Sequence, residues 1–235
     1  MNDCVKKLFF LAGIILATAG CQKMNDKHKS WLETGEIIYI GKVDSVKIFS
    51  GNERILFRYW ISDPRVKTLN VAWSLGRESI EVTVPAHLPA EPFDLYIGRN
   101  EKDITEGVHT FNWVTQDQYN NKSVIFEITG NVYGSKYHST LINRPLISAE
   151  ADGTDVTLVW GEKISEDEVE VNVNYTTTSD VPVILRCSGN ERISAVVNDV
   201  KLTAPVTYST LYLPEPNAID TFSTVSQTID ISIIR

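Results

Sequence analysis

The sequence predicts an all-β protein built from two β-sandwich domains in tandem, behind an N-terminal leader. Three observations support this prediction. Apolar and polar residues alternate with a period of two in most segments from Glu36 onward, which is the pattern of half-buried strands. Turn-forming residues such as Ser62-Asp63-Pro64-Arg65 separate these segments. The alternation stops at Asn143-Arg144-Pro145, where proline disfavours a continuing strand, and then starts again.

The N-terminus has the features of an export signal. Lys6 and Lys7 precede a twelve-residue apolar stretch, which suits a signal peptide and is too short to span a bilayer. It ends in Thr18-Ala19-Gly20-Cys21, which resembles a lipobox, although Thr18 stands where Leu is usual. We therefore expect residues 1–20 to be removed, Cys21 to carry lipid, and residues 21–35 to form a tether. An ordinary secretory signal with a chance cysteine is the alternative.

The predicted anchor and the net charge of the mature chain indicate which partners to expect. The lipid on Cys21 makes the membrane a partner, and Gln22, in place of the Asp associated with inner-membrane retention, favours the outer membrane. The mature chain carries 20 basic and 29 acidic residues, a net charge of −9, so it repels nucleic acid. Cys187 is then the one remaining thiol, and its alternating surroundings favour a place in the core over a reactive role.

The alternating segments divide into two groups, each near the size of one sandwich domain. Residues 36–145 form the first domain, with about seven strands, and residues 146–235 form the second. A single intertwined sandwich is the rival interpretation of the same length. The segments that we expect to be strands are 54–61, 69–73, 80–84, 93–97, 108–115 and 123–132 in the first group, and 156–160, 169–175, 183–187, 193–197, 208–213 and 229–234 in the second.

Short motifs resemble known sandwich families. Val156-x-Leu158-x-Trp160 followed by an alternating segment that ends in Tyr175 resembles the B and C strands of a fibronectin type III domain. In the first domain, residues 104–123 resemble the penultimate strand and hairpin of Ig-like and PKD-like domains, with His109 where Tyr often lies. The resemblance implies architecture alone. Ser-Gly-Asn-Glu-Arg-Ile occurs at 50–55 and 188–193, and we interpret both copies as hairpin turns.

A longer pattern extends over most of the mature chain. Its residues are Gly35-Glu36, Tyr39, Gly41-Lys42, Asp44-Ser45-Val46, Gly51, Arg54, Trp60, Ser62-Asp63-Pro64-Arg65-Val66, Val132-Tyr133-Gly134, Leu141, Asn143-Arg144, Leu213-Pro214-Glu215 and Ile219-Asp220-Thr221-Phe222. This pattern resembles an uncharacterised domain-of-unknown-function family of Bacteroidetes-type lipoproteins. The resemblance implies a surface lipoprotein, in a setting of polysaccharide utilisation, and it implies no catalytic residues.

No catalytic or metal motif stands out. The four histidines lack zinc-site spacing, and no nucleophile elbow, phosphate loop or dinucleotide fingerprint occurs, so we expect neither metal nor cofactor. Paired carboxylates remain open because their partnership is spatial. Glu166-Asp167-Glu168 is interpreted as a solvated loop. Asp117, Asn120 and Asn121 offer oxygen ligands for calcium, but an Asx-rich turn explains them better.

Aromatic residues are the remaining candidates for binding. Trp73, Trp113 and Trp160 share the parity of core aliphatics. Alternation turns Trp60 outward with Arg54 and Arg58, whereas comparison with Trp160 would place it inside. A glycan would stack on exposed Trp60 and bond to arginine.

We expect a non-catalytic, lipid-anchored binding or accessory protein, with a glycan or another surface protein as partner. The glycan-binding residues that we expect are Trp60, Arg58, Arg54 and Tyr119. A fimbrial or adhesin subunit is the alternative, because the alternating segment 228–234 suits a donated or edge strand. An enzyme of unknown class comes third.

Overall fold

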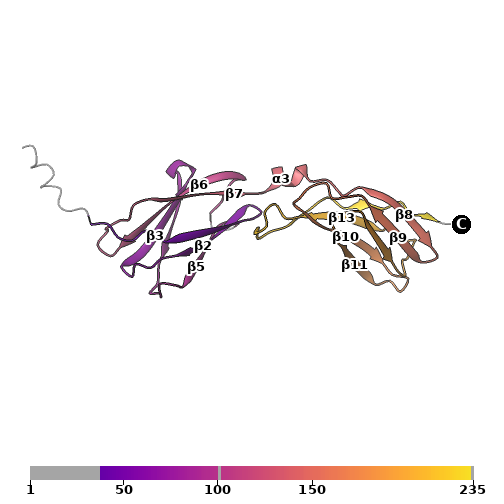
Figure 1. Cartoon of the computed structure of the whole chain (residues 1–235), viewed down its shortest axis with the longest axis horizontal. Coiled ribbons are helices and arrows are strands. Elements are labelled where there is room, and N and C mark those ends of the chain that lie inside the picture. The colour runs from indigo at the N-terminus through magenta and orange to yellow at the C-terminus, as the bar shows by residue number, and fades with distance from the viewer. Residues whose placement is uncertain (1–37, 100–101, 234–235) are drawn as a thin grey trace, which may run out of the picture.

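The computed structural model describes residues 38–99 and 102–233, and these form two β-sandwiches arranged end to end (Figure 1). Within these residues, no strand of the first sandwich pairs with a strand of the second. Each sandwich also has its own buried hydrophobic cluster. The expected all-β fold with sandwich sheets is therefore confirmed. The predicted leader, the lipidated Cys21 and the tether at 21–35 lie outside the described residues.

The first sandwich packs a three-stranded sheet, in the order β1-β2-β5, against a four-stranded sheet, in the order β4-β3-β6-β7. All pairs within the two sheets are antiparallel. The strands are β1 (Ser45–Ser50), β2 (Arg54–Trp60), β3 (Val66–Trp73), β4 (Glu78–Thr83), β5 (Pro92–Gly98), β6 (Gly107–Asp117) and β7 (Phe126–Val132), with the short 3₁₀ helix η1 (Ser74–Gly76) between β3 and β4.

Aromatic side chains from both sheets fill the first core. Phe57 on β2 lies edge-on to Phe111 and Trp113 on β6, with ring centroids 4.7 and 5.1 Å apart. Trp73 packs on the same Phe111 ring. Alternation along β2 places Ile55, Phe57 and Tyr59 inside, so Arg54, Arg58 and Trp60 lie on its other side. The expectation that Trp73, Trp113 and Trp160 are core residues is confirmed.

The second sandwich repeats this strand order. Its sheets are β12-β9-β8, extended by β16, and β11-β10-β13-β14, with β15 also pairing with β13. In both sandwiches the first, second and fifth strands share one sheet and the third, fourth, sixth and seventh share the other, as in a fibronectin type III-like fold. The strands are β8 (Leu146–Asp152), β9 (Asp155–Trp160), β10 (Glu168–Thr176), β11 (Pro182–Cys187), β12 (Ile193–Val197), β13 (Thr207–Tyr212), β14 (Phe222–Ser223), β15 (Gln227–Thr228) and β16 (Ser232–Ile233).

The structure contains elements that the alternation did not predict. β1 and β8 were missed, as was α3 (Ser135–Thr140), a short helix between the sandwiches (Figure 1). In the segment expected as one strand at 229–234, the described residues form only the two-residue β16, which runs parallel to β8, whereas β15 lies just before the segment and pairs with β13 in the other sheet. Ile229 between them is buried in the core. Within the described residues, no helix has the length and apolar composition needed to cross a membrane.

His109 occupies the position that the Ig-like resemblance assigns to a tyrosine. Its Nε2 lies 2.7 Å from the carbonyl oxygen of Thr105, four residues upstream. A tyrosine hydroxyl at this corner of a sandwich bonds to upstream backbone in the same manner. The imidazole therefore stabilises the start of β6, and its Nε2 atom is already engaged with the backbone.

The loop at 213–221, between β13 and β14, reaches from the second sandwich to the β1–β2 turn of the first. The Ile219 amide donates to the carbonyl of Ser50 over 2.8 Å, and the Asn52 amide donates to the Asp220 carboxylate over 2.9 Å. Tyr137 on α3 packs edge-on to Phe222, with centroids 5.0 Å apart. These contacts, together with α3, form the junction between the two sandwiches.

Candidate functional site

The outer side of the β1-β2-β5 sheet brings two of the predicted site residues together. Registered cross-strand neighbours form three rows on this side, Ser45–Trp60–Pro92, Lys47–Arg58–Asp94 and Phe49–Leu56–Tyr96. A charged row thus lies between two rows that carry aromatic rings. We call this surface the Trp60 face, and we define it by Lys47, Phe49, Arg58, Trp60, Asp94 and Tyr96.

Arg58 and Asp94 form a two-pronged ion pair in the middle row. The Nε and Nη2 atoms of Arg58 each donate to one Asp94 oxygen over 2.7 Å. The side chains are 43% and 37% exposed, so solvent screening limits what the pair adds to stability. Hydrogen bonding from Arg58 lowers the pKa of Asp94, so the carboxylate stays charged at neutral pH. The pair holds an oriented guanidinium and a carboxylate at the surface.

Trp60 lies half-buried on this face. Alternation predicted this outward orientation, whereas comparison with Trp160 predicted a place in the core. The Lys47 ammonium is 5.7 Å from the centre of the Trp60 ring, and the Arg58 guanidinium is 5.9 Å from that of Phe49. Tyr96 exposes 47% of its surface in the third row. The face therefore combines apolar rings with fixed donors and acceptors, a combination that can recognise a small polar ligand.

The other two predicted binding residues lie elsewhere. Arg54 is at the opposite end of β2 from Trp60, about 20 Å along an extended strand. Its Nε and Nη2 donate to Asp220 over 2.8 and 2.6 Å, so it belongs to the junction. Tyr119 lies at the tip of the loop between β6 and β7, on the opposite sheet. The structure thus separates Arg54 and Tyr119 from the Trp60 face.

The Asp117 loop is an Asx turn, as expected. One oxygen of Asp117 accepts the amides of Tyr119 and Asn121 over 2.8 and 2.9 Å, and the other accepts the Asn121 side-chain amide. Asn120 has a left-handed backbone, with φ of 66°. Hydrogen bonding from Asn121 leads the causes that lower the pKa of Asp117. The described ranges contain no group of His, Cys, Asp or Glu residues arranged to hold a metal ion.

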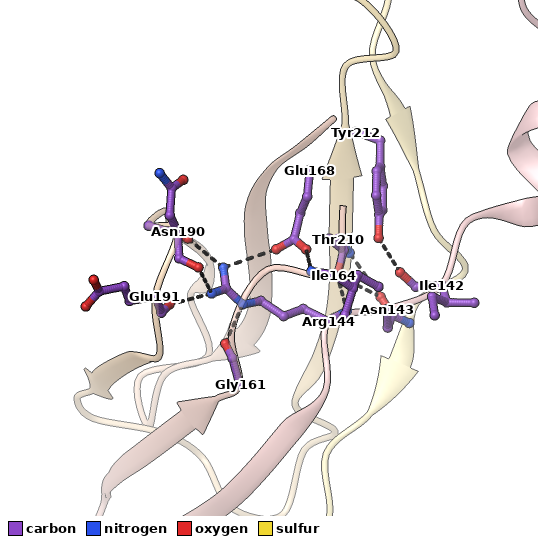
Figure 2. Close-up of polar contacts among 11 residues, drawn as sticks. Ile142, Asn143, Arg144, Gly161, Ile164, Glu168, Asn190, Glu191, Thr210 and Tyr212 are labelled. Atoms are coloured by element: carbon purple, nitrogen blue, oxygen red, sulfur yellow. Dashed lines mark hydrogen bonds and ion pairs between the residues drawn. The ribbon is translucent and has the colours of Figure 1, made fainter. Parts of the chain in front are cut away.

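The sequence missed a buried polar network around Arg144 (Figure 2). Its guanidinium donates to the carbonyl oxygens of Gly161 and Gly189 over 2.8 Å and to that of Glu191 over 2.5 Å. It also pairs with Glu168 over 3.1 Å, with side chains 1% and 0% exposed. Asn143-Arg144 is therefore the end of the linker, and Arg144 also binds the β9–β10 loop, the β11–β12 loop and the start of β10.

Two interpretations of loops are corrected by this network. Glu166-Asp167-Glu168 was expected to be solvated, but Glu168 begins β10 and is buried against Arg144, and Asp167 accepts the Tyr137 hydroxyl. Arg144, which is 24 residues away in the sequence, and the Ile164 amide, which donates over 3.3 Å, together make burial of the Glu168 carboxylate tolerable. The copy of Ser-Gly-Asn-Glu-Arg-Ile at 188–193 is not a hairpin, because β11 and β12 belong to different sheets. The copy at 50–55 does connect the paired strands β1 and β2.

Cys187 lies in the core of the second sandwich, as predicted, and is a free thiol. Burial is the main cause that raises its pKa, which keeps the sulfur protonated and a poor nucleophile at neutral pH. This thiol is therefore a small apolar packing group.

Residues 21–222 match the model of a family described as a domain of unknown function, DUF4998. The chain belongs to this family. The match includes both sandwiches up to the start of β14, together with the Trp60 face, the junction and the Arg144 network. It bears out the part of the sequence resemblance that pointed to a domain-of-unknown-function family.

No curated protein matches this member of DUF4998. Among solved structures, it is similar to a two-domain fibronectin type III segment from chicken tenascin, at 12% identity and a TM-score of 0.32, over 80% of this chain and 99% of that one. It is also similar to the FN1–FN3 domains of chicken CNTN1, at 9% identity and a TM-score of 0.41, over 81% and 64% of the two chains.

Proposed function

We propose that the protein is a non-catalytic, lipid-anchored binding or accessory protein of the outer membrane, and that it contacts glycan through the Trp60 face. The observation that carries this proposal is the cross-strand arrangement of Trp60, Arg58 and Asp94 on one accessible sheet surface. A pyranose presents C–H groups that an indole can contact, and vicinal hydroxyls suit both a guanidinium and a carboxylate.

The surroundings of the Trp60 face support weak and reversible binding. The face belongs to a sheet rather than to a deep cavity, so a ligand would keep much of its hydration. Arg58 is already oriented by Asp94, which reduces the ordering that a ligand must impose on it. We expect dissociation constants between roughly micromolar and millimolar, about −8 to −4 kcal/mol.

The fimbrial alternative has less support, because the C-terminal segment is used within its own sandwich. β15 pairs with β13, β16 pairs with β8, and Ile229 fills the core between them. Donation of this segment to a neighbouring subunit would remove these contacts. A ladder of stable multimers would favour the fimbrial reading over the proposed binder.

The proposed anchor comprises a leader at 1–20 and a lipidated Cys21 with its tether at 21–35, ahead of domains at 36–145 and 146–235. The DUF4998 match begins at residue 21, which supports a leader distinct from the domain. Cys21→Ala should abolish incorporation of labelled palmitate in the native host, whereas Cys187→Ala, the matched control, should retain it. Labelling of the Cys21→Ala variant would contradict the anchor.

Glycan binding is tested with the purified protein on a glycan array and in affinity gels. Arg58→Lys should weaken binding about tenfold or more, because lysine cannot reproduce the two-pronged contact. Arg186→Lys, on an exposed arginine of the second sandwich, is the control and should bind as the wild type does. Failure of the wild type to bind any glycan would contradict the proposed ligand class.

A further inference from the structure

The first sandwich carries a group of exposed apolar side chains at the end where the described chain begins. The β2–β3, β4–β5 and β6–β7 loops lie at this end, because neighbouring strands are antiparallel. The N-terminal segment joins them, since Thr115 Oγ donates to the carbonyl of Gly41 over 2.6 Å and the Gly41 amide donates to Asp63 over 2.7 Å. We call residues 38–44, 61–65, 84–91 and 118–125 the tip.

The exposed apolar residues of the tip come from three separate segments. Their exposed fractions range from 52% to 74%. They are Ile38, Tyr39, Leu88, Tyr119, Val124 and Ile125. Single apolar residues on a surface need no explanation, but a group at one end of a domain marks a contact site. Tyrosine beside aliphatic side chains is typical of surfaces at the membrane–water interface.

The charge of the tip differs from that of the rest of the molecule. Its four segments contain Lys42, Arg65 and Lys122 against Asp44, Asp63 and Glu91, whereas the whole chain has a net charge of −8. Asp63 is paired with Arg65 over 2.7 Å. An anionic lipid surface therefore repels the tip less than it repels the rest of the protein surface on average.

The covalent path from Cys21 also ends at the tip. Sixteen residues separate Cys21 from Ile38. Covalent geometry alone limits the distance between Cys21 and Ile38 to roughly 56–61 Å. The second sandwich lies at the opposite end of the first (Figure 1). The tip is thus the part of the fold that a lipid on Cys21 holds nearest to the bilayer.

We propose that the tip rests in the headgroup region of the membrane to which the protein is anchored, with Tyr119, Val124 and Ile125 inserted among the headgroups. This inference rests on the proposed anchor at Cys21. Contact at the tip restricts rotation about the tether and directs the second sandwich away from the membrane. The Trp60 face lies along the side of the first sandwich, and its Ser45–Trp60–Pro92 row adjoins the tip.

The test couples Cys21 of the mature chain, residues 21–235, to a maleimide lipid in vesicles of phosphatidylethanolamine and phosphatidylglycerol. This chain includes both sandwiches. An encoded fluorescent amino acid replaces Ile125 in one sample and Val225, an exposed residue of the second sandwich, in the control. Nitroxide-bearing lipid should quench the probe at 125 several-fold more than the probe at 225, and aqueous iodide should show the reverse order.

Tyr119→Asp combined with Val124→Asp should bring quenching at position 125 down to the control level, while the melting temperature stays unchanged because both residues are exposed. Equal quenching at 125 and 225 in the unaltered tip would overturn the proposal. Chemical coupling makes this result independent of palmitate labelling in the cell, so failure of the tip contact and failure of the natural anchor are distinguishable.

Discussion

The position of Trp60 follows from the local sequence pattern, whereas the partner of Arg144 does not. Alternation along β2 was sufficient to place Trp60 with Arg58 on the outer side, because side chains in a strand point to opposite faces in turn. No local pattern could pair Arg144 with Glu168, since the partners are 24 residues apart and the strands β8 and β9 lie between them in the chain. The burial of Glu168 was therefore missed.

Replacing Arg144 should be costly, because its loss leaves a buried carboxylate and several carbonyl oxygens without their donor. Arg144→Met is expected to lower the free energy of unfolding by about 3–5 kcal/mol. The double variant Arg144→Met, Glu168→Met should recover part of that loss, since no unpaired charge remains. Urea unfolding measures both. A loss below about 1 kcal/mol in the single variant would mean that the network contributes little.

At the scale of elements, the β13–β14 loop couples the two sandwiches through close contacts with the β1–β2 turn. These contacts require glycine at position 51. A Cβ at Gly51 would lie 2.7 Å from an Asp220 oxygen and 2.9 Å from Ile219. The sequence suggested a hairpin turn at 50–55 but not its partner, because the loop is 160 or more residues away. The resemblance pattern contained both segments, Gly51 with Arg54 and Glu215 with Asp220, which was the available signal.

The junction should give acid sensitivity with a defined sign. Burial tends to raise the pKa of Asp220, but hydrogen bonds from Arg54 and the Asn52 amide outweigh it, and the net pKa is lowered. A lowered pKa stabilises the fold fully above the unfolded value of about 3.9, and this contribution is lost as pH falls through the folded value.

Asp220→Asn should therefore lower the free energy of unfolding by about 1–3 kcal/mol at pH 7, with the difference disappearing at pH values below the folded pKa. Urea midpoints measured from pH 7 down to pH 2 would show this convergence. Asp230→Asn, on an exposed aspartate of the second sandwich, serves as the control. A difference that is constant throughout the range would refute the ionic coupling.

At the scale of the whole molecule, the sequence predicted the fold class and most strands, because each sandwich buries one side of its sheets and so alternates. It did not predict β1, although Val46 and Ile48 alternate there, or that β15 and β16 near the C-terminus pair in different sheets. Alternation reports which side of a strand is buried and not which strand lies beside it. The same limit explains why Tyr119 was assigned to a face that it does not share, whereas Arg54 was assigned on parity alone and lies at the far end of β2 from Trp60.

The central claim is that Trp60 points outward and binds glycan. The variant Trp60→Ala tests this claim when glycan binding and thermal unfolding are measured on the same sample. We expect the variant to lose binding to the glycan that the wild type recognises while its melting temperature stays within a few degrees. Trp160→Ala, which empties a fully buried site, should instead cost about 3–5 kcal/mol. A fall in melting temperature for Trp60→Ala as large as that for Trp160→Ala, or undiminished glycan binding, would contradict the account.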